Sequence, residues 1–351
     1  MVFFILNAIL GIILIEKVLK NTRRCREVVE ERDRMFPAWR RIDAHRMTRC
    51  MLYPGAIMLL VPRLIALVVG FTILYMLLAV INFGRTKEEL FKQTPGCRTS
   101  LTRFLIATGC RLILLGFCIC SKKRRVASDY TKYLGRDYKE KFVEPCSVPT
   151  IISNHSGPLD IIQIGASFSG KVAFIAKGEL ESVPIIGYLI TVMGGAFAPR
   201  FSGKAARDGL VEVIAERQKE LESDPNCHKS PLILFSEGST QNNQFLCPFK
   251  RGAFTTRTTI QPVIMTYFSR QVYPFNEVIG DLDCIIFTGC SMWPQIIETL
   301  IMDPFQPTDY LFETHKDEGA QDWQIQAWAI REAMSKVSGI PICDQDQKEH
   351  F

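Results

Sequence analysis

The stretch SNHSGPLDII, residues 153–162, places His155 and Asp160 around a Gly-Pro turn that follows an apolar run. The run VPTIIS at 148–153 predicts a buried strand, and a helix is predicted to begin near Leu159. His155 is therefore expected at the carboxyl end of a strand, where open α/β sheets bind their ligands. Asp160 would lie about one helical turn away, close enough to accept a hydrogen bond from one imidazole nitrogen.

A carboxylate that holds one nitrogen of a histidine leaves the other nitrogen free to take a proton. His155 and Asp160 would then be the base and its orienting group, without a protein nucleophile beside them, which suits activation of a substrate hydroxyl. The spacing alone equally allows a helix-capping Asp160 beside a passive His155. Because the chain has no G-x-S-x-G motif, a serine hydrolase is not indicated. It also has no H-E-x-x-H or C-x-x-C metal motif.

Polar residues also follow other predicted strands. FSEGST at 235–240 follows the strand LILF, and GGAFAPR at 194–200 ends in an arginine whose forked guanidinium matches a phosphate. AKGEL at 176–180 follows a third strand. Each stretch taken alone is more often an ordinary turn or a surface cation. The candidate binding residues at these strand ends are Asn154, Lys177, Arg200, Glu237, Gly238 and Ser239.

The surrounding pattern alternates short β-rich runs with amphipathic helices. This alternation predicts an α/β fold with a mostly parallel sheet flanked by helices. The predicted strands are 148–153, 171–176, 232–235 and 260–268, and the predicted helices are 160–168, 181–193, 204–222 and 322–337.

The N-terminal third predicts membrane helices. Residues 64–83 form a 20-residue run without a charge, long enough to span a bilayer. Residues 104–120 contain Arg111 and are expected half-embedded or in the interface. Residues 2–15 lack a positive n-region and predict an uncleaved anchor. The basic loop 84–103 favours the cytosolic side.

Charge and composition narrow the classes of partner. The net charge is 42 − 36 = +6, and basic residues crowd beside apolar runs, as Lys122–Arg125 do, which suits an anionic membrane surface. The sequence has no basic stripe interleaved with aromatic residues, so nucleic-acid binding is not indicated. The 12 cysteines lack metal-binding spacing and are expected to be reduced.

We expect an anchor and a charged, solvated helix in 1–50, membrane-embedded helices in 51–121, and a catalytic domain in 122–351 with its motif core at 148–270.

Taken together, the strand-end motifs resemble those of the PlsC-type glycerophospholipid acyltransferases. The ending MWPQIIETLIMDPFQPTD, followed by a helix before GIP, resembles the lysophosphatidylcholine/lysophosphatidylethanolamine acyltransferase branch. The matching residues are Asn154, His155 and Asp160 for N-H-x-x-x-x-D, then Ala176, Lys177, Glu179 and Leu180, then Gly195 through Arg200, then Glu237, Gly238 and Ser239 for E-G-T-R, and an apolar run around Pro262.

One departure bears on the substrate. Where E-G-T-R has arginine, this chain has Thr240. In lysophosphatidate acyltransferases that arginine would help to hold a bare phosphomonoester, so its absence favours a lysophospholipid with a head group. The third motif of the lysophosphatidylcholine branch also lacks the arginine, which agrees with this expectation.

The resemblance implies transfer of an acyl chain from acyl-CoA, as co-substrate, to the free hydroxyl of a lysophospholipid. His155 would be the general base and Asp160 would orient it, with no other cofactor and no metal. Arg200, Glu237 and Gly238 would position the glycerophosphate, and Lys177 would face a phosphate. The expected site is the endoplasmic reticulum membrane, with the catalytic domain facing the cytosol. Lysophosphatidate or glycerol 3-phosphate as acceptor, and a non-catalytic membrane protein that binds lipid or acyl-CoA, remain the alternatives.

Overall fold

The centre of the protein is a seven-stranded sheet with the strand order β1-β7-β6-β2-β5-β3-β4. A computed structural model describes residues 2–198, 204–276 and 278–345. Strands β2 to β6 all run in one direction, whereas β1 and β7 are parallel to each other and β7 is antiparallel to β6. The mostly parallel sheet predicted from the sequence is therefore confirmed. The strands are β1 Ile119–Val126, β2 Thr150–Ser153, β3 Ala173–Lys177, β4 Ala196–Ala198, β5 Leu232–Phe235, β6 Ile260–Phe268 and β7 Gln295–Met302.

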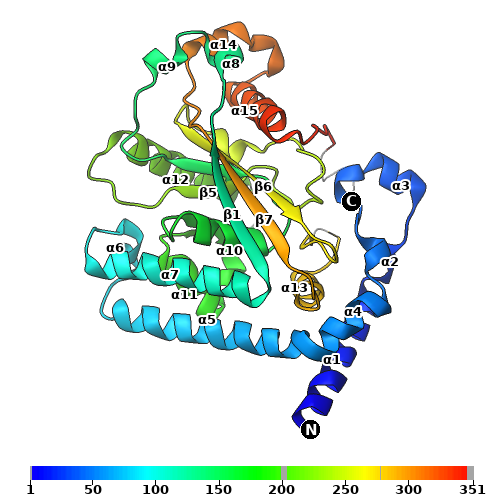
Figure 1. Ribbon diagram of the computed structural model, residues 1–351. Helices are drawn as coiled ribbons and strands as arrows, with labels where there is room; N and C mark the ends of the chain where they lie inside the picture. The colour runs from blue at the N-terminus through cyan, green and yellow to red at the C-terminus, as the bar shows by residue number, and fades with distance from the viewer. Residues whose placement is uncertain (1, 199–203, 277, 346–351) are drawn as a thin grey trace.

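Helices flank the sheet, as Figure 1 shows. The predicted helices 160–168, 181–193, 204–222 and 322–337 correspond to α10, α11, α12 and α15. The α-helices are α1 Val2–Asn21, α2 Arg23–Arg26, α3 Glu30–Met35, α4 Arg49–Gly55, α5 Val61–Ile81, α6 Lys87–Lys92, α7 Cys97–Gly116, α8 Thr131–Leu134, α9 Tyr138–Lys141, α10 Leu159–Ser167, α11 Pro184–Val192, α12 Lys204–Ser223, α13 Asp281–Gly289, α14 Asp309–Thr314 and α15 Asp322–Ser338.

Both faces of the sheet are buried, because successive side chains along a strand point to opposite faces. Ile151 and Ile233 belong to the core that contains side chains of α7, α10 and α11. Their neighbours Ile152 and Leu234 belong with the core that contains side chains of α8, α14 and α15. This double burial explains why the strands appear in the sequence as short, continuous apolar runs.

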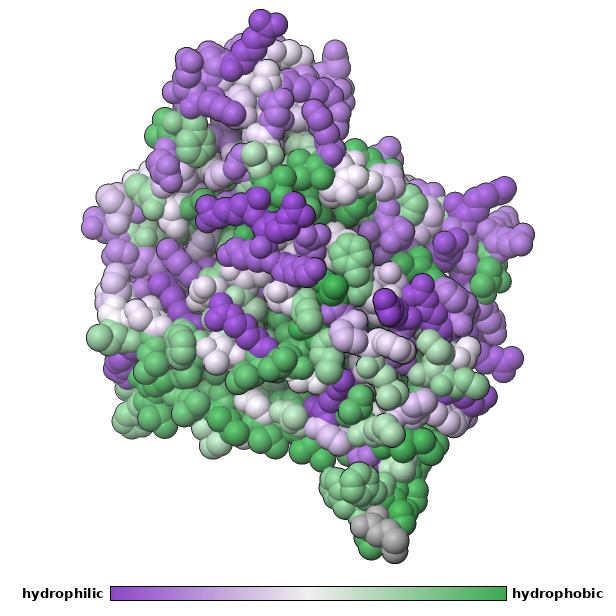
Figure 2. Space-filling view, in the orientation of Figure 1, coloured by the Kyte–Doolittle hydropathy of each residue, from purple (hydrophilic) through white to green (hydrophobic). Residues whose placement is uncertain are grey.

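Three helical stretches are long and apolar enough to cross a membrane: Val2–Asn21, Arg49–Ile81 and Cys97–Gly116. The second combines α4, a π-helical turn at Ala56–Leu60 and α5. Figure 2 shows a hydrophobic band over α5 and α7, with α1 projecting below it. The predicted membrane helices near the N-terminus are confirmed to this extent, and the stretch predicted at 104–120 ends as helix at Gly116 and continues into β1.

The apolar helices pack closely at two glycines, once against each other and once against the end of α13. A Cβ added at Gly11 would lie 2.0 Å from the carbonyl oxygen of Ala56, where α1 crosses the π-helical turn. A Cβ added at Gly55 would lie 1.8 Å from the carbonyl oxygen of Cys290, just after α13. Only glycine allows backbones to approach this closely.

Residues 36–47, which we call the N-terminal strap, differ from the sequence prediction. Instead of the one charged, solvated helix expected after the anchor within 1–50, α1 continues to Asn21 and is followed by short helical turns. Trp39, Arg41 and Asp43 of the strap are buried. The sequence of this region predicted a surface helix because charges of both signs are dense in it.

The strap is held by a buried ion pair. Nε of Arg41 lies 2.6 Å from Oδ1 of Asp43, and both side chains are almost completely inaccessible. Arg41 donates to the carbonyl oxygens of Tyr273 and Phe275, and Asp43 accepts from the backbone N–H of Tyr273. These hydrogen bonds satisfy the charged groups out of water, which a buried ion pair requires.

The basic run Lys122–Arg125 lies in β1, at the outer edge of the sheet. Its side chains are mostly exposed. Charged side chains, lysine above all, are a common protection of sheet edges against pairing with other chains. The sequence suggested only a membrane-surface cluster here, because a strand made of consecutive charged residues has no alternating apolar pattern.

We predict that Asp43→Ala destabilises the protein by about 3–5 kcal/mol, because it leaves the Arg41 guanidinium buried without its partner. Thermal or chemical unfolding in detergent measures the effect. Asp137→Ala, which breaks an exposed pair with Lys141, is the matched control and should have a much smaller effect. Equal stability of the two variants would contradict a structural role for the strap.

Candidate functional site

Three of the predicted site residues, Asn154, His155 and Asp160, lie just beyond the carboxyl end of β2. The chain leaves β2 at Ser153, passes through Asn154 and His155, and turns at Gly157-Pro158 into α10. A Cβ at Gly157 would lie 2.0 Å from the carbonyl oxygen of Pro274, so the turn requires glycine there. Because β2, β3, β5 and β6 are parallel, their carboxyl ends share one edge of the sheet.

His155 and Asp160 form a hydrogen-bonded pair. Nδ1 of His155 lies 2.6 Å from Oδ2 of Asp160. The carboxylate is fully buried, whereas 19% of the His155 side chain remains exposed. With Nδ1 donating to the carboxylate, Nε2 is the nitrogen that can accept a proton. The geometry therefore favours the base-and-orienter arrangement over a passive histidine.

Asp160 does not depend on His155 alone for hydrogen bonds. Its Oδ2 also accepts from the backbone N–H groups of Ser156, at 2.5 Å, and Gly157, at 3.1 Å. Its Oδ1 accepts from the hydroxyl of Tyr267 on β6. These donors satisfy both oxygens of the buried carboxylate.

The imidazole of His155 is also held by stacking. Its ring lies on that of Phe235, with centroids 3.8 Å apart and planes 9° from parallel. Phe235 is the last residue of β5, the neighbour of β2. The ring plane of the base is thus fixed by a hydrogen bond at one edge and an aromatic face beside it.

Asn154 connects β2 to β6 beyond the last pair of their ladder. Its side-chain oxygen accepts from the N–H of Met265, and its Nδ2 donates to the Met265 carbonyl, both at 2.8 Å. Nδ2 also donates to the side chain of Asn243. Asn154 is buried, and its amide is engaged by the protein on both sides.

Glu237 is buried beneath the same turn. Its Oε1 accepts from the N–H of Cys247 at 2.8 Å, and its Oε2 accepts from the N–H of His155 at 3.3 Å. Burial raises the pKa of Glu237 to about 8, while these N–H groups act in the opposite direction. The carboxyl group thus joins the turn after β5 to the backbone of His155.

Three other predicted binding residues, Lys177, Gly238 and Ser239, lie at neighbouring strand ends. Gly238 has φ +75°, a left-handed conformation that favours glycine, and Ser239 follows it as a buried residue. Lys177 is the last residue of β3 and pairs in register with Ala198 of β4. The side chain of Lys177 and the whole of Arg200 lie outside the described residues.

Sequence reasoning missed two contributors to this site. Tyr267 could have been found by counting, because β6 is parallel to β2 and its last residues reach the same edge of the sheet. Nothing in the sequence indicated that the N-terminal strap contributes to the site. Asn242, in the loop after β5, donates to the carbonyl oxygens of Ala38, Pro37 and Arg40. The next residue back, Gln241, donates its N–H to the carbonyl of His155.

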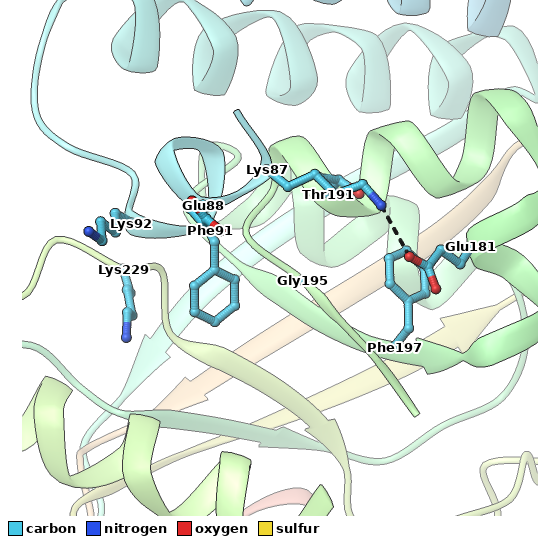
Figure 3. Close-up of a pocket in the computed structure, with 9 residues that line it drawn as sticks. All are labelled: Lys87, Glu88, Phe91, Lys92, Glu181, Thr191, Gly195, Phe197 and Lys229. Atoms are coloured by element: carbon cyan, nitrogen blue, oxygen red, sulfur yellow. Dashed lines mark hydrogen bonds and ion pairs between the residues drawn. The ribbon is translucent and has the colours of Figure 1, made fainter. Parts of the chain in front are cut away.

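A cavity of about 340 Å³ lies between α6 and β4 (Figure 3). Lys87 on its wall pairs with Glu181 at 3.2 Å, and Phe91 and Phe197 line it. Its lining includes none of the predicted site residues. Within the described ranges, no group of three or more His, Cys, Asp or Glu side chains could hold a metal ion.

Comparison with curated proteins finds lysophospholipid acyltransferases. The chain is 30% identical over 150 residues to a lysophospholipid acyltransferase of Arabidopsis thaliana, covering 42% of this chain and 36% of that protein. It is 23% identical over 312 residues to the lysophosphatidylcholine acyltransferase of Drosophila melanogaster, covering 86% and 51%. With human lysophosphatidylcholine acyltransferase 2, it shares 23% over 263 residues, covering 70% and 44%. The chain thus spans from about a third to about half of the length of these relatives.

Among solved structures, the crystal structure of the 1-acyl-sn-glycerophosphate acyltransferase PlsC from Thermotoga maritima matches with a TM-score of 0.38 at 13% identity. The match covers 79% of this chain and 98% of that one. The family model described as Acyltransferase matches residues 145–266, which contain β2 to β6 up to Thr266 and both residues of the His155–Asp160 pair. Residues 145–266 of this chain are therefore a PlsC-type acyltransferase domain.

Proposed function

We propose that the protein is a lysophospholipid acyltransferase, which transfers an acyl chain from acyl-CoA to the free hydroxyl of a lysophospholipid. The observation that carries the proposal is the 2.6 Å contact between Nδ1 of His155 and the buried carboxylate of Asp160. The curated relatives, whose names specify lysophospholipid acceptors, support the class of substrate. Lysophosphatidylcholine and lysophosphatidylethanolamine are the acceptors we favour.

The reaction needs one proton acceptor and no enzyme nucleophile. Nε2 of His155 removes the proton of the lipid hydroxyl as its oxygen attacks the thioester carbonyl. Asp160 stays ionised and stabilises the imidazolium that forms. The tetrahedral intermediate collapses by breaking the C–S bond, and the CoA sulfur leaves with the proton returned by His155. The products are a diacyl phospholipid and CoA-SH.

We propose that residues at the strand ends contact the glycerophosphate. Arg200 and Lys177 supply positive charge, and the backbone at Gly238 and Ser239 approaches the phosphate closely. Thr240 stands where lysophosphatidate acyltransferases carry arginine, which favours a phosphodiester over a phosphomonoester. For Asn154 and Glu237 we propose a role in holding the turn instead of contact with substrate, which is supported by the hydrogen bonds of their polar atoms to the protein backbone.

The apolar helices would hold this chemistry at the bilayer surface, where both amphiphilic substrates reside. The large exposed hydrophobic side chains on α1, α5 and α7 are the surface that would contact lipid. We propose that the domain faces the cytosol, where the basic loop 84–103 would lie and where acyl-CoA is found. The endoplasmic reticulum is the proposed membrane.

We predict that His155→Ala lowers acyl transfer by about 10²–10⁴-fold, because a positioned general base typically contributes that much. The assay follows labelled acyl-CoA with a panel of lysophosphatidylcholine, lysophosphatidylethanolamine, lysophosphatidate and glycerol 3-phosphate. His45→Ala, which changes an exposed histidine of the strap, is the control and should retain activity.

The same panel separates the alternatives. Turnover of lysophosphatidate or glycerol 3-phosphate alone would show that the acceptor is a phosphomonoester and not the proposed lysophospholipid with a head group. Binding of acyl-CoA without turnover of any acceptor would favour a non-catalytic lipid-binding protein. An active His155→Ala variant would contradict the assignment of the base.

We predict that Glu237→Gln lowers kcat with little change in KM, because the amide can accept only one of the two backbone hydrogen bonds that hold the turn. Steady-state kinetics with the preferred acceptor measures both constants. Glu298→Gln, at an exposed pair with Arg124 on the sheet edge, is the matched control. A raised KM with an unchanged kcat would instead place Glu237 in contact with the substrate.

A further inference from the structure

Tyr267 reaches the His155–Asp160 pair from a different strand. It lies near the carboxyl end of β6, is only 5% exposed, and donates its hydroxyl hydrogen bond to Oδ1 of Asp160. The other carboxylate oxygen, Oδ2, is occupied by His155 Nδ1 and by the N–H groups of Ser156 and Gly157. Tyr267 therefore supplies the hydrogen bond on the side of the carboxylate that faces away from the base.

The position of Tyr267 follows from the register of the sheet. Ser153, the last residue of β2, pairs with Val263 of β6, and Asn154 then engages the backbone of Met265. Val263, Met265 and Tyr267 alternate along β6, so their side chains share the face that α10 covers. Asp160 lies in the first turn of α10, directly over this face. The Asn154 clamp and the Tyr267 hydroxyl are thus two successive ties between β6 and the site.

We propose that Tyr267 is a positioning residue of the acyl transfer reaction, which fixes the orientation and the basicity of Asp160 and through it those of His155. The inference rests on the proposed function. A hydroxyl hydrogen bond to Oδ1 draws negative charge away from Oδ2, the atom that faces the imidazole. It also gives Oδ1, which is buried with the rest of Asp160, a hydrogen-bond partner.

The hydroxyl stays protonated over the working range of pH. Burial, and then the adjacent Asp160 carboxylate, raise the pKa of Tyr267 well above its ordinary value. Among the residues that the structure describes, the titratable groups that face Tyr267 are Asp160 from α10 and Cys284 from α13. Burial raises the pKa of the Cys284 thiol to about 12, so this group is neutral. Glu237, from the turn after β5, contacts the backbone of His155.

Tyr267→Phe tests the proposal, because it removes the hydroxyl and keeps the ring that packs in the core. We expect kcat to fall by about tenfold, because Asp160 without its hydrogen bond to Tyr267 holds His155 less firmly in the reactive orientation, and this loss outweighs the gain in basicity. KM for the acceptor and for acyl-CoA should stay unchanged. The acid limb of the pH–rate profile should move upward by about one unit, because a carboxylate with more charge on Oδ2 stabilises the imidazolium more strongly.

Tyr130→Phe is the matched control, because Tyr130 is a buried tyrosine whose hydroxyl donates at 2.7 Å to the carbonyl of Asp303. It should lose stability without a shift in the pH profile. In a His155→Ala background, Tyr267→Phe should cause no further loss of activity. An unshifted pH profile in Tyr267→Phe, or a loss that adds fully to that of His155→Ala, would overturn the proposal.

An NMR titration of the His155 ring separates this inference from the proposed function. In the folded protein, Tyr267→Phe should raise the pKa of His155 even where no acceptor is turned over. A raised pKa in an inactive protein would support the role of Tyr267 and overturn the proposed reaction. An unchanged pKa in an active enzyme would overturn the role of Tyr267 and leave the reaction standing.

Discussion

The site depends on one fully buried carboxylate. Moving a charged carboxyl group out of water is costly unless hydrogen bonds replace its hydration. Asp160 receives them from His155, from two backbone N–H groups of its own turn and from Tyr267. Because these donors come from β6 and from the turn between β2 and α10, the carboxylate can be satisfied only when the sheet is assembled in this register.

The surrounding structure secures the backbone on which the base is carried. Glu237 and Gln241, in the turn and loop that follow β5, contact the N–H and the C=O of His155 respectively. Asn276 donates its N–H to the carbonyl of Ser156, and the strap holds Tyr273 and Phe275 just before it. The strap lies between α3 and α4, and α4 belongs to the apolar helical stretch Arg49–Ile81. The segments that would contact the bilayer and the loops beside the base are therefore parts of one packed structure.

The sequence predicted the parts of the fold that have a periodic signal. The strand LILF and the strand at 260–268 match the structure, and the helix predicted at 204–222 differs by one residue at its end. The pairing of His155 with Asp160 also followed from spacing, because it lies within one turn of chain. β1 escaped prediction because its residues are charged and its stability comes from pairing with β7. Tyr267 and the strap escaped because both act across more than 100 residues of sequence, a distance at which composition and periodicity carry no information.

Replacing Asp160 by asparagine tests the central claim most directly, because it removes the negative charge and keeps the size of the side chain. The measurement is the rate of acyl transfer from acyl-CoA to the preferred lysophospholipid, by purified wild type and Asp160→Asn in the same vesicles. We expect the variant to lose about 10²–10⁴-fold in kcat, since the imidazolium would form without a counter-charge and in the wrong tautomer. A variant within a few-fold of the wild-type rate would show that the buried carboxylate does not serve the base.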